Sequence, residues 1–351
     1  IRDHCRCPTC FHPETKQRLI ETFLELPEDI HILDVREEGD LVQIVSDGHT
    51  SQYPRDWLAA SALKGKTRAV GRQGTTDETD FKQTPVEVEY AKVMESDEGV
   101  GEWLLLIRKY GFAYVNGCPA TPEATEKLLE RISYIRNTHY GAFWDFTANM
   151  AAKDTAYTTL AIGSHTDTTY FSDPCGLQMF HLLSHTGGQG GKSLLSDGFA
   201  TAKALRDEDP QAYKILSEVP VHSHASGNEG LSIQPFQTYP VLNHDTQSGE
   251  LIQVRWNTTD RAAIDLPLED MDLWYKAARK WARQLEHHHY WEQLRPERPL
   301  IFDNWRVLHG RSNFTGKRRL CGGYINHDDF ISRFKMTNFG ETKVLEQVSL
   351  G

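Results

Sequence analysis

The chain has 351 residues, 39% of them hydrophobic and 10% aromatic, which is enough to bury a sizeable core. Its formal net charge of −11 argues against a general nucleic-acid-binding protein, because phosphate contacts need basic patches. No apolar run approaches the roughly 20 residues that span a bilayer, so we expect a soluble protein that does not enter membranes. The six cysteines are unevenly placed, which is untypical of a disulfide framework and indicates a reducing compartment.

Residues 30–53 predict a small β-structure. HILDV and LVQIVS are short strand candidates separated by EEGD, and an Asp-Gly turn leads into HTSQY. Pro54 lies near the first turn of a short helix candidate, PRDWLAASAL. The polar, glycine-containing stretch from Lys64 to Pro85 is typical of a linker. We therefore expect two domains, residues 1–75 and residues 86–351.

The second region begins with two helix candidates. The first contains Trp103, Leu104 and Ile107 and leads into the strand candidate GFAYV. The second starts at Thr121-Pro122-Glu123, where a hydroxyl caps the helix and proline occupies its first position. We expect this second helix to run to about Arg136.

From Tyr157 onward, short apolar strand candidates alternate with turns. Examples are GLQMFHLL, SLLSDGF, LIQVRW, RPLIFDN and RRLCGGYIN, interrupted by a helical insert from about Glu269 to Glu286. This pattern predicts a mainly β fold with flanking helices, either a barrel or a double-sheet jelly roll. The marks of three common enzyme classes are missing: GxGxxG after a strand, a Walker loop and a GxSxG elbow.

Three cysteines, Cys5, Cys7 and Cys10, stand within six residues in CRCPTC. Thiols this close together are better explained by a soft cation than by packing, and Zn²⁺ takes four such ligands in a closed tetrahedral site. The fourth ligand remains open at this point, because His4 and His12 are adjacent in sequence and His49 follows a turn from which it could fold back. The alternative is a reduced cluster that binds nothing.

The stretch GSHTDTTY contains His165 and Asp167, which would share one face of a strand. His309, in FDNWRVLHGR, lies far downstream and completes a 2-His-1-carboxylate triad, which leaves positions on Fe(II) open for a cosubstrate and O2. Arg318 follows nine residues later. Its planar cation suits the far carboxylate of 2-oxoglutarate.

Other histidines are weaker candidates for a metal site. His327-x-Asp329 repeats the spacing but has no later histidine, and residues 287–289 are consecutive on a predicted helix end, so they cannot share a face. His222 and His224 have no carboxylate at a suitable offset. We expect all of these to be structural or solvent-exposed.

HTDTTYFSDPCGLQMFHLL, FDNWRVLHGRSNFTGKRRLCGGY and IRDHCRCPTC, with their spacings preserved, resemble the γ-butyrobetaine/trimethyllysine dioxygenases, the Fe(II)- and 2-oxoglutarate-dependent hydroxylases of carnitine biosynthesis. The resemblance covers nearly the whole chain, and HTDTTYF, AYTTLA and DNWRVLHGR are closest to the trimethyllysine branch. It implies a small N-terminal zinc-binding β domain, a double-stranded β-helix (jelly roll) catalytic domain and a homodimer.

The resemblance also implies roles for individual residues. The implied zinc ligands are Cys5, Cys7, Cys10 and His49, and the implied iron ligands are His165, Asp167 and His309. Arg318, supported by Ser193, would bind 2-oxoglutarate. A trimethylammonium group cannot donate N–H hydrogen bonds, so aromatic faces hold it best; the implied cage is Tyr140, Trp144, Tyr157 and Tyr324. Asp154 would pair with the substrate's α-ammonium and Asn257 with its carboxylate.

We therefore expect hydroxylation of C3 of Nε-trimethyllysine by Fe(II), 2-oxoglutarate and O2, with ascorbate as an accessory reductant. Three alternatives stay open: γ-butyrobetaine hydroxylation, a non-catalytic zinc-binding interaction protein, and a methyl-lysine reader of peptides. The chain opens abruptly with IRDHC. If a transit peptide preceded it and was removed, the mitochondrial matrix is expected; otherwise the cytoplasm is.

Overall fold

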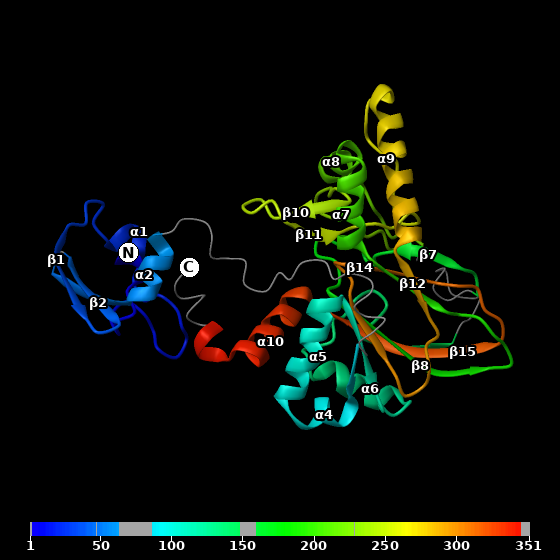
Figure 1. Ribbon diagram of the computed structural model, residues 1–351, viewed down its shortest axis with the longest axis horizontal. Coiled ribbons are helices and arrows are strands. Elements are labelled where there is room, and N and C mark those ends of the chain that lie inside the picture. Colours follow the sequence, from blue (N-terminus) through cyan, green and yellow to red (C-terminus); the bar gives the residue numbers. More distant parts are fainter. Residues whose placement is uncertain (1, 47, 63–85, 148–158, 228, 345–351) are drawn as a thin grey trace. The chain divides into compact units, whose positions relative to one another are not determined.

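The computed structural model describes residues 2–46, 48–62, 86–147, 159–227 and 229–344. The chain divides into two compact units, residues 1–72 with 339–351 and residues 73–338 (Figure 1). The predicted linker, Lys64 to Pro85, falls outside the described residues. Among the described residues, none of the helices combines the length and apolar character that a bilayer crossing requires.

Unit 1 is built on a three-stranded antiparallel sheet of order β1-β2-β3. Its elements are η1 (Arg2–His4), α1 (Thr22–Glu25), β1 (Ile32–Glu38), β2 (Leu41–Ser46), β3 (His49–Pro54) and α2 (Arg55–Ala62). Side chains of β2 alternate between buried and partly exposed, which directs Val42 and Ile44 inward. They pack with Tyr53 and Trp57 in a core of four buried residues. The three predicted strands and the short helix are confirmed.

Unit 2 contains a six-stranded sheet of order β4-β5-β13-β8-β15-β6, a four-stranded sheet of order β12-β9-β14-β7, and the hairpin β10-β11. The strands are β4 (Glu87–Glu89), β5 (Phe112–Asn116), β6 (Phe143–Thr147), β7 (Ile162–His165), β8 (Leu177–Thr186), β9 (Ser193–Asp197), β10 (Leu242–His244), β11 (Leu251–Val254), β12 (His289–Glu292), β13 (Leu300–Asp303), β14 (Val307–Arg311) and β15 (Lys317–Ile325). Every pairing is antiparallel except that of β4 with β5. The mainly β architecture with flanking helices agrees with the prediction.

The helices of unit 2 form two groups, with α4, α5, α6 and α10 in one and α7, α8 and α9 in the other (Figure 1). They are α4 (Tyr90–Glu95), α5 (Asp97–Tyr110), α6 (Pro122–Glu130), α7 (Gly198–Glu208), α8 (Pro210–Glu218), α9 (Leu268–His287) and α10 (His327–Phe339). The long α9 buries Trp274, Trp281 and Leu285, at helical spacing, against α7 and α8, in an apolar cluster that also includes residues of the β10-β11 hairpin. This satellite core supports the turn after β11 that reaches the site described below.

One local expectation was wrong. The helix that starts at Thr121 ends at Glu130 rather than near Arg136. The last turn tightens into bonds three residues apart, from Arg131 N to the carbonyl of Leu128 and from Ile132 N to that of Leu129, and Arg136 N then donates to the carbonyl of Tyr324 at 2.8 Å. Trp144 belongs to β6, which pairs with β15.

Candidate functional site

A cavity opens between the two large sheets of unit 2. Side chains of β7, β9 and β14 line it from one sheet, and side chains of β6, β8 and β15 line it from the other. Nine of the predicted iron, cosubstrate and substrate residues line this one cavity: Tyr140, Trp144, His165, Asp167, Ser193, Asn257, His309, Arg318 and Tyr324. The other two, Asp154 and Tyr157, lie outside the described residues.

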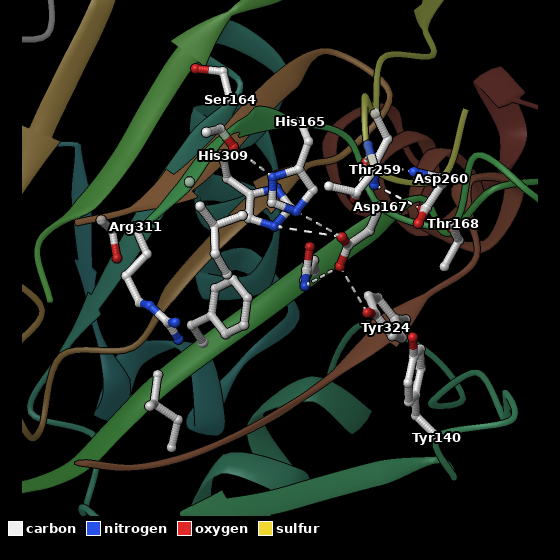
Figure 2. A pocket seen from close by; sticks show the side chains of 18 of the residues that line it. Tyr140, Ser164, His165, Asp167, Thr168, Thr259, Asp260, His309, Arg311 and Tyr324 are labelled. Atoms are coloured by element: carbon white, nitrogen blue, oxygen red, sulfur yellow. Dashed lines mark hydrogen bonds and ion pairs between the residues drawn. The ribbon is translucent and has the colours of Figure 1, made fainter. Parts of the chain in front are cut away.

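The three predicted iron ligands converge in this cavity (Figure 2). His165 ends β7, and the antiparallel register pairs it directly with His309 of β14. Asp167 Oδ1 lies 3.2 Å from His165 Nε2 and 3.8 Å from His309 Nε2. Neighbouring ligands of an octahedral cation bonded at about 2.1 Å would lie about 3 Å apart. The side chains are thus close to the spacing that one ion needs.

Asp167 reaches this position differently from the sequence argument. β7 stops at His165, so Asp167 lies in the following turn and not on the strand face. Thr168 has φ +59°, a left-handed conformation that is strained for a β-branched residue. Local bonds hold this turn: Thr168 Oγ1 accepts from Cys175 N at 2.9 Å, and Thr166 N donates to the carbonyl of Trp256 at 2.7 Å.

The cluster offers a cation one neutral imidazole and one carboxylate that ionises readily. Burial, reinforced by the charge of His165, lowers the pKa of His309 to about 3, so its imidazole is neutral and offers a lone pair. Burial alone would lower the pKa of His165, but the hydrogen bond and negative charge of Asp167 raise it. His165 Nδ1 lies 2.9 Å from the carbonyl of Gly163, which can only accept, so Nε2 is left to face Asp167. Burial opposes ionisation of Asp167, yet the two imidazoles hold its pKa below the usual range.

The backbone and side chain of Asp167 are anchored separately. Asn304 accepts from Asp167 N at 2.8 Å and donates to its carbonyl at 3.0 Å. The second carboxylate oxygen, Oδ2, accepts from Gln178 Nε2 at 2.8 Å and from the Tyr324 hydroxyl at 2.9 Å. The oxygen that faces the imidazoles is therefore Oδ1.

A buried arginine lines the cavity with no acceptor bonded to its Nε. Arg318 is 2% exposed, and its Nε has no hydrogen-bond partner among the described residues. Burial, with the charge of Arg311, lowers the pKa of Arg318 to about 10. A desolvated guanidinium beside another cation is unfavourable until an anion joins it. Ser193, which pairs with Arg311 across β9 and β14, also lines the cavity. These residues fit a ligand carboxylate.

Aromatic side chains gather at another part of the cavity. Trp144 and Tyr324 have ring centroids 6.1 Å apart and meet edge to face. Figure 2 shows Tyr140 beside Tyr324, while Arg311 lies on the opposite side of the histidines. Tyr170, 4% exposed, adds a further aromatic wall, with its hydroxyl 3.5 Å from that of Tyr140. The aromatic part and the arginine part of the cavity thus flank the cluster.

Asn257 lines the cavity but its amide is engaged in a turn. Its Nδ2 donates to Asp260 Oδ2 at 2.8 Å, and its Oδ1 accepts from Thr259 N at 3.0 Å. This turn brings a second carboxylate, Asp260, into the cavity lining.

Sequence reasoning missed several of these residues. Arg311 could have been found, because it follows His309 by two residues on the same strand and so shares its face. Gln178, Asp260 and Tyr170 carry no such signal, since only the strand register and turn geometry bring them to the cavity.

The weaker histidine candidates lie outside both clusters. His222 and His224 are exposed. His327 stacks on Trp305 with ring centroids 4.0 Å apart and faces Asp303 at 3.9 Å, so it serves packing.

Unit 1 contains a second cluster, formed by Cys5, Cys7, Cys10 and His49. The three Sγ atoms lie 3.2, 3.6 and 3.7 Å from His49 Nε2. A tetrahedral zinc ion with bonds of about 2.3 Å to sulfur and 2.05 Å to nitrogen would set these distances at about 3.6 Å. Partial burial opposes ionisation of Cys7, but hydrogen bonds from Thr9 and the other thiols lower its pKa to about 7. The donors fit a closed zinc site.

The other two candidate zinc ligands are used elsewhere. His4 packs on Trp57, with ring centroids 5.5 Å apart, and His12 Nδ1 accepts from the backbone of Glu14 and Thr15.

Comparison with known proteins covers both units. The model of the family described as Taurine catabolism dioxygenase TauD, TfdA family, matches residues 73–324, and that of Gamma-butyrobetaine hydroxylase-like, N-terminal, matches residues 1–59. Trimethyllysine dioxygenase of Neurospora crassa is 44% identical over 99% of this chain and 82% of its own length. Mitochondrial trimethyllysine dioxygenase of Homo sapiens is 38% identical over 96% of this chain and 81% of its own length.

A solved structure bears on the fold alone. A protein of Burkholderia xenovorans assigned as an alpha-ketoglutarate-dependent taurine dioxygenase covers 69% of this chain and 90% of its own, with a TM-score of 0.52 at 10% identity. The structural similarity of the two chains agrees with the two-sheet architecture of unit 2. The sequence identities, which run through both units, settle the family: the chain belongs to the trimethyllysine dioxygenases, within the TauD/TfdA dioxygenases.

Proposed function

We propose that this chain hydroxylates C3 of Nε-trimethyllysine with Fe(II), 2-oxoglutarate and O2, giving 3-hydroxy-trimethyllysine, succinate and CO2, the first step of carnitine biosynthesis. The observation that carries the proposal is the layout of one cavity. A three-ligand cluster lies there together with a buried arginine that lacks a partner for its Nε among the described residues and with a group of aromatic side chains. Membership of the trimethyllysine dioxygenases supports it.

His165, Asp167 and His309 would hold the iron through two imidazole nitrogens and one carboxylate oxygen. This donor set is typical of Fe(II) sites that keep positions open. When bound, the iron supplies the oxidising chemistry that couples decarboxylation of 2-oxoglutarate to hydroxylation. The contribution of the residues themselves is to position the iron. The cross-strand pair of histidines and the anchored aspartate fix where the reaction takes place.

Arg318 would bind the far carboxylate of 2-oxoglutarate, with Ser193 as a supporting contact. The low exposure of Arg318 favours this role, because a buried guanidinium gains most from a charged, bidentate partner. A carboxylate bound there would stand at the end of the cavity away from the aromatic side chains.

Tyr140, Trp144, Tyr157 and Tyr324 would form the cage for the trimethylammonium group. Cation–π contact suits a quaternary ammonium, which has no N–H to donate. Asp154 would pair with the α-ammonium of the substrate, and Asn257 would contact its carboxylate. Holding both ends of the substrate would determine that C3, rather than another carbon, faces the reaction centre.

Cys5, Cys7, Cys10 and His49 would bind a structural zinc ion in an N-terminal domain of residues 1–75, followed by the catalytic domain of residues 86–351. Four protein ligands leave no open position, which is typical of structural zinc. The small apolar core of unit 1 supports this role, since domains of this size commonly need a metal to fold. We further propose that ascorbate sustains turnover, that the chain is a homodimer, and that it acts in the mitochondrial matrix, as the name of the human relative suggests for that protein.

A competition assay tests the substrate. The purified protein with Fe(II), 2-oxoglutarate and ascorbate receives trimethyllysine and γ-butyrobetaine together, and the hydroxylated products are separated by mass. We expect hydroxytrimethyllysine to dominate. Preferential hydroxylation of γ-butyrobetaine would overturn the substrate assignment, and the absence of iron-dependent CO2 release from 2-oxoglutarate would overturn the enzymatic one. Asp154→Asn is expected to reduce trimethyllysine turnover selectively, by about 10-fold, because it removes a charged hydrogen-bond acceptor.

A further inference from the structure

We propose that Gln178 and Tyr324 form a clamp on Asp167 that fixes this carboxylate so that a single oxygen faces the metal, and that Tyr324 thereby joins the substrate cage to the metal ligands. The inference rests on the proposed iron site and concerns only how this chain's own residues shape it. Neither Gln178 nor Tyr324 would touch the metal, so both are positioning residues.

The clamp is defined by two donors on one atom. Gln178 Nε2 and the Tyr324 hydroxyl both donate to Asp167 Oδ2, at 2.8 and 2.9 Å (Figure 2). Both donors are sheltered, since Gln178 is 2% exposed and Tyr324 5% exposed. Oδ1 is the oxygen that lies 3.2 Å from His165 Nε2. The two carboxylate oxygens therefore have separate tasks.

The topology explains why these two side chains meet the same oxygen. Gln178 of β8 and Tyr324 of β15 are directly opposite each other in the antiparallel register of the six-stranded sheet. Side chains paired in this way point to the same face, about 5 Å apart. Asp167 comes from the turn after β7, in the other sheet. The clamp thus ties the metal-binding turn of one sheet to the facing surface of the other, across the cavity.

The chemistry gives the clamp a function. A carboxylate can bind a cation through one oxygen or through both. Binding through both would occupy a position that a two-pronged cosubstrate or O2 needs on the metal. Two hydrogen bonds to Oδ2 oppose that rotation, while Asn304 fixes the backbone on which the carboxylate turns. Hydrogen-bonded partners of metal ligands commonly change metal affinity 10- to 100-fold.

Tyr324 has a second role through its ring. The ring lines the cavity and meets Trp144 edge to face, so it belongs to the wall where the trimethylammonium group would bind. The same hydroxyl bond that orients Asp167 also holds the outer end of this ring in place. Gln178 has no ring and contributes to the carboxylate alone.

The experiment is an anaerobic titration of the zinc-loaded full chain with Co(II), followed by visible absorption, which reports both affinity and coordination geometry. The variants are Tyr324→Phe, which keeps the ring, Gln178→Met, which keeps the length, and the double variant. We expect each single variant to weaken Co(II) binding about 10-fold and the double variant about 100-fold, with an altered spectrum. Tyr140→Phe, another tyrosine of the cavity, should bind Co(II) as tightly as the wild type. Circular dichroism confirms that each variant is folded.

Substrate binding separates the two halves of the proposal. At saturating Co(II) and 2-oxoglutarate, Tyr324→Phe should bind trimethyllysine several-fold more weakly, whereas Gln178→Met should not. A double variant that is folded and binds Co(II) within twofold of the wild type, with an unchanged spectrum, overturns the clamp. Equal trimethyllysine binding by Tyr324→Phe and the wild type overturns the link to the cage.

The proposed iron site fails by a different result. His165→Ala that still binds Co(II) with wild-type affinity would show that the triad is not the metal site, whatever the clamp variants do. Loss of Co(II) binding in His165→Ala together with wild-type binding in the double clamp variant would reject the clamp alone.

Discussion

The two candidate metal-binding clusters among the described residues differ in the number and chemistry of their donors. Unit 1 brings together three thiols and one imidazole, whereas unit 2 brings together two imidazoles and one carboxylate. The first set is complete for a tetrahedral ion, and the second leaves positions open on an octahedral one. Within one chain, donor number and softness thus separate a cation suited to building structure from one suited to chemistry.

The two clusters also differ in their surroundings: one is enclosed by a small domain, and the other lines a cavity. In unit 1, Cys5 and Cys10 are about as buried as the four apolar residues of its small core. In unit 2, the cluster lines a cavity, and most of the satellite core around Trp274 and Trp281 comes from elements that hold none of its ligands: α7, α8, α9 and the β10-β11 hairpin. Metal loss should therefore unfold the first unit but only inactivate the second. Four predictions test this contrast.

The largest effect is expected in unit 1. His49→Ala should lose zinc and unfold this unit, because structural zinc contributes on the order of 10 kcal/mol to folding in small domains. The measurements are zinc content by mass spectrometry and protease resistance of residues 2–62. His12→Ala is the matched control and should keep both, since its imidazole only caps a local turn. Full protease resistance of His49→Ala after verified zinc loss would count against the structural role.

The second prediction concerns unit 2. His165→Ala removes one of three ligands, so succinate formation at saturating iron should fall by more than about 100-fold, beyond the effect of losing an outer partner. The fold should remain, as judged by an unchanged melting profile. His224→Ala removes an exposed histidine and should be fully active. Retention of wild-type turnover by His165→Ala would reject the assignment of the triad.

How much the sequence could predict depends on how far apart along the chain the interacting residues lie. Strands, caps and turns depend on neighbouring residues, so the β1-β2-β3 hairpins and the start of α6 at Thr121 followed from local pattern. The family motifs placed His309 and Arg318 in the same cavity as His165, although more than 140 residues separate His165 from His309. Motif spacing could do this because the family resemblance assigns the roles of distant residues together.

Features set by register or by a strained turn could not be predicted. The placement of Asp167 depends on the positive φ of Thr168, which no local rule assigns to threonine. Gln178 meets Asp167 only because β8 and β15 pair in one register, and a one-residue slip would turn it away. Beyond the end of α6 at Glu130, the backbone is held by a bond from Arg136 N to the carbonyl of Tyr324, which lies almost 200 residues away.

A third test separates ligand binding from stability within unit 2. Arg318→Met removes a buried cation, so 2-oxoglutarate should bind about 100-fold more weakly. The variant should be no less stable than the wild type without 2-oxoglutarate, because the lost charge is desolvated and lies near Arg311. Thermal melting with and without 2-oxoglutarate measures both. The control is Arg319→Met, whose guanidinium pairs with Asp145 at the surface and which should bind 2-oxoglutarate normally. Marked destabilisation of Arg318→Met in the absence of ligand would contradict this account.

The smallest effect concerns the stability of unit 2 in acid. In unit 2, His181 is fully buried, and burial lowers its pKa to about 4. Thr125 Oγ1 donates to the Thr121 carbonyl and so must accept from His181 Nδ1, at 2.6 Å. His181 Nε2 has no hydrogen-bond partner among the described residues, so protonation would bury an unpaired N–H⁺.

The sign of the pH effect follows from this environment. Below its ordinary pKa of about 6.5, His181 binds a proton in the unfolded chain but not in the folded one, so stability falls as the pH falls towards 4. The loss should reach about 2 kcal/mol at pH 5, at about 1.4 kcal/mol per pH unit. Urea unfolding between pH 4.5 and 7.5, followed by tryptophan fluorescence, measures the slope. His181→Phe should flatten it by that amount even if the variant is less stable at pH 7.5, and an unchanged slope would mean that other buried groups carry the acid sensitivity of unit 2.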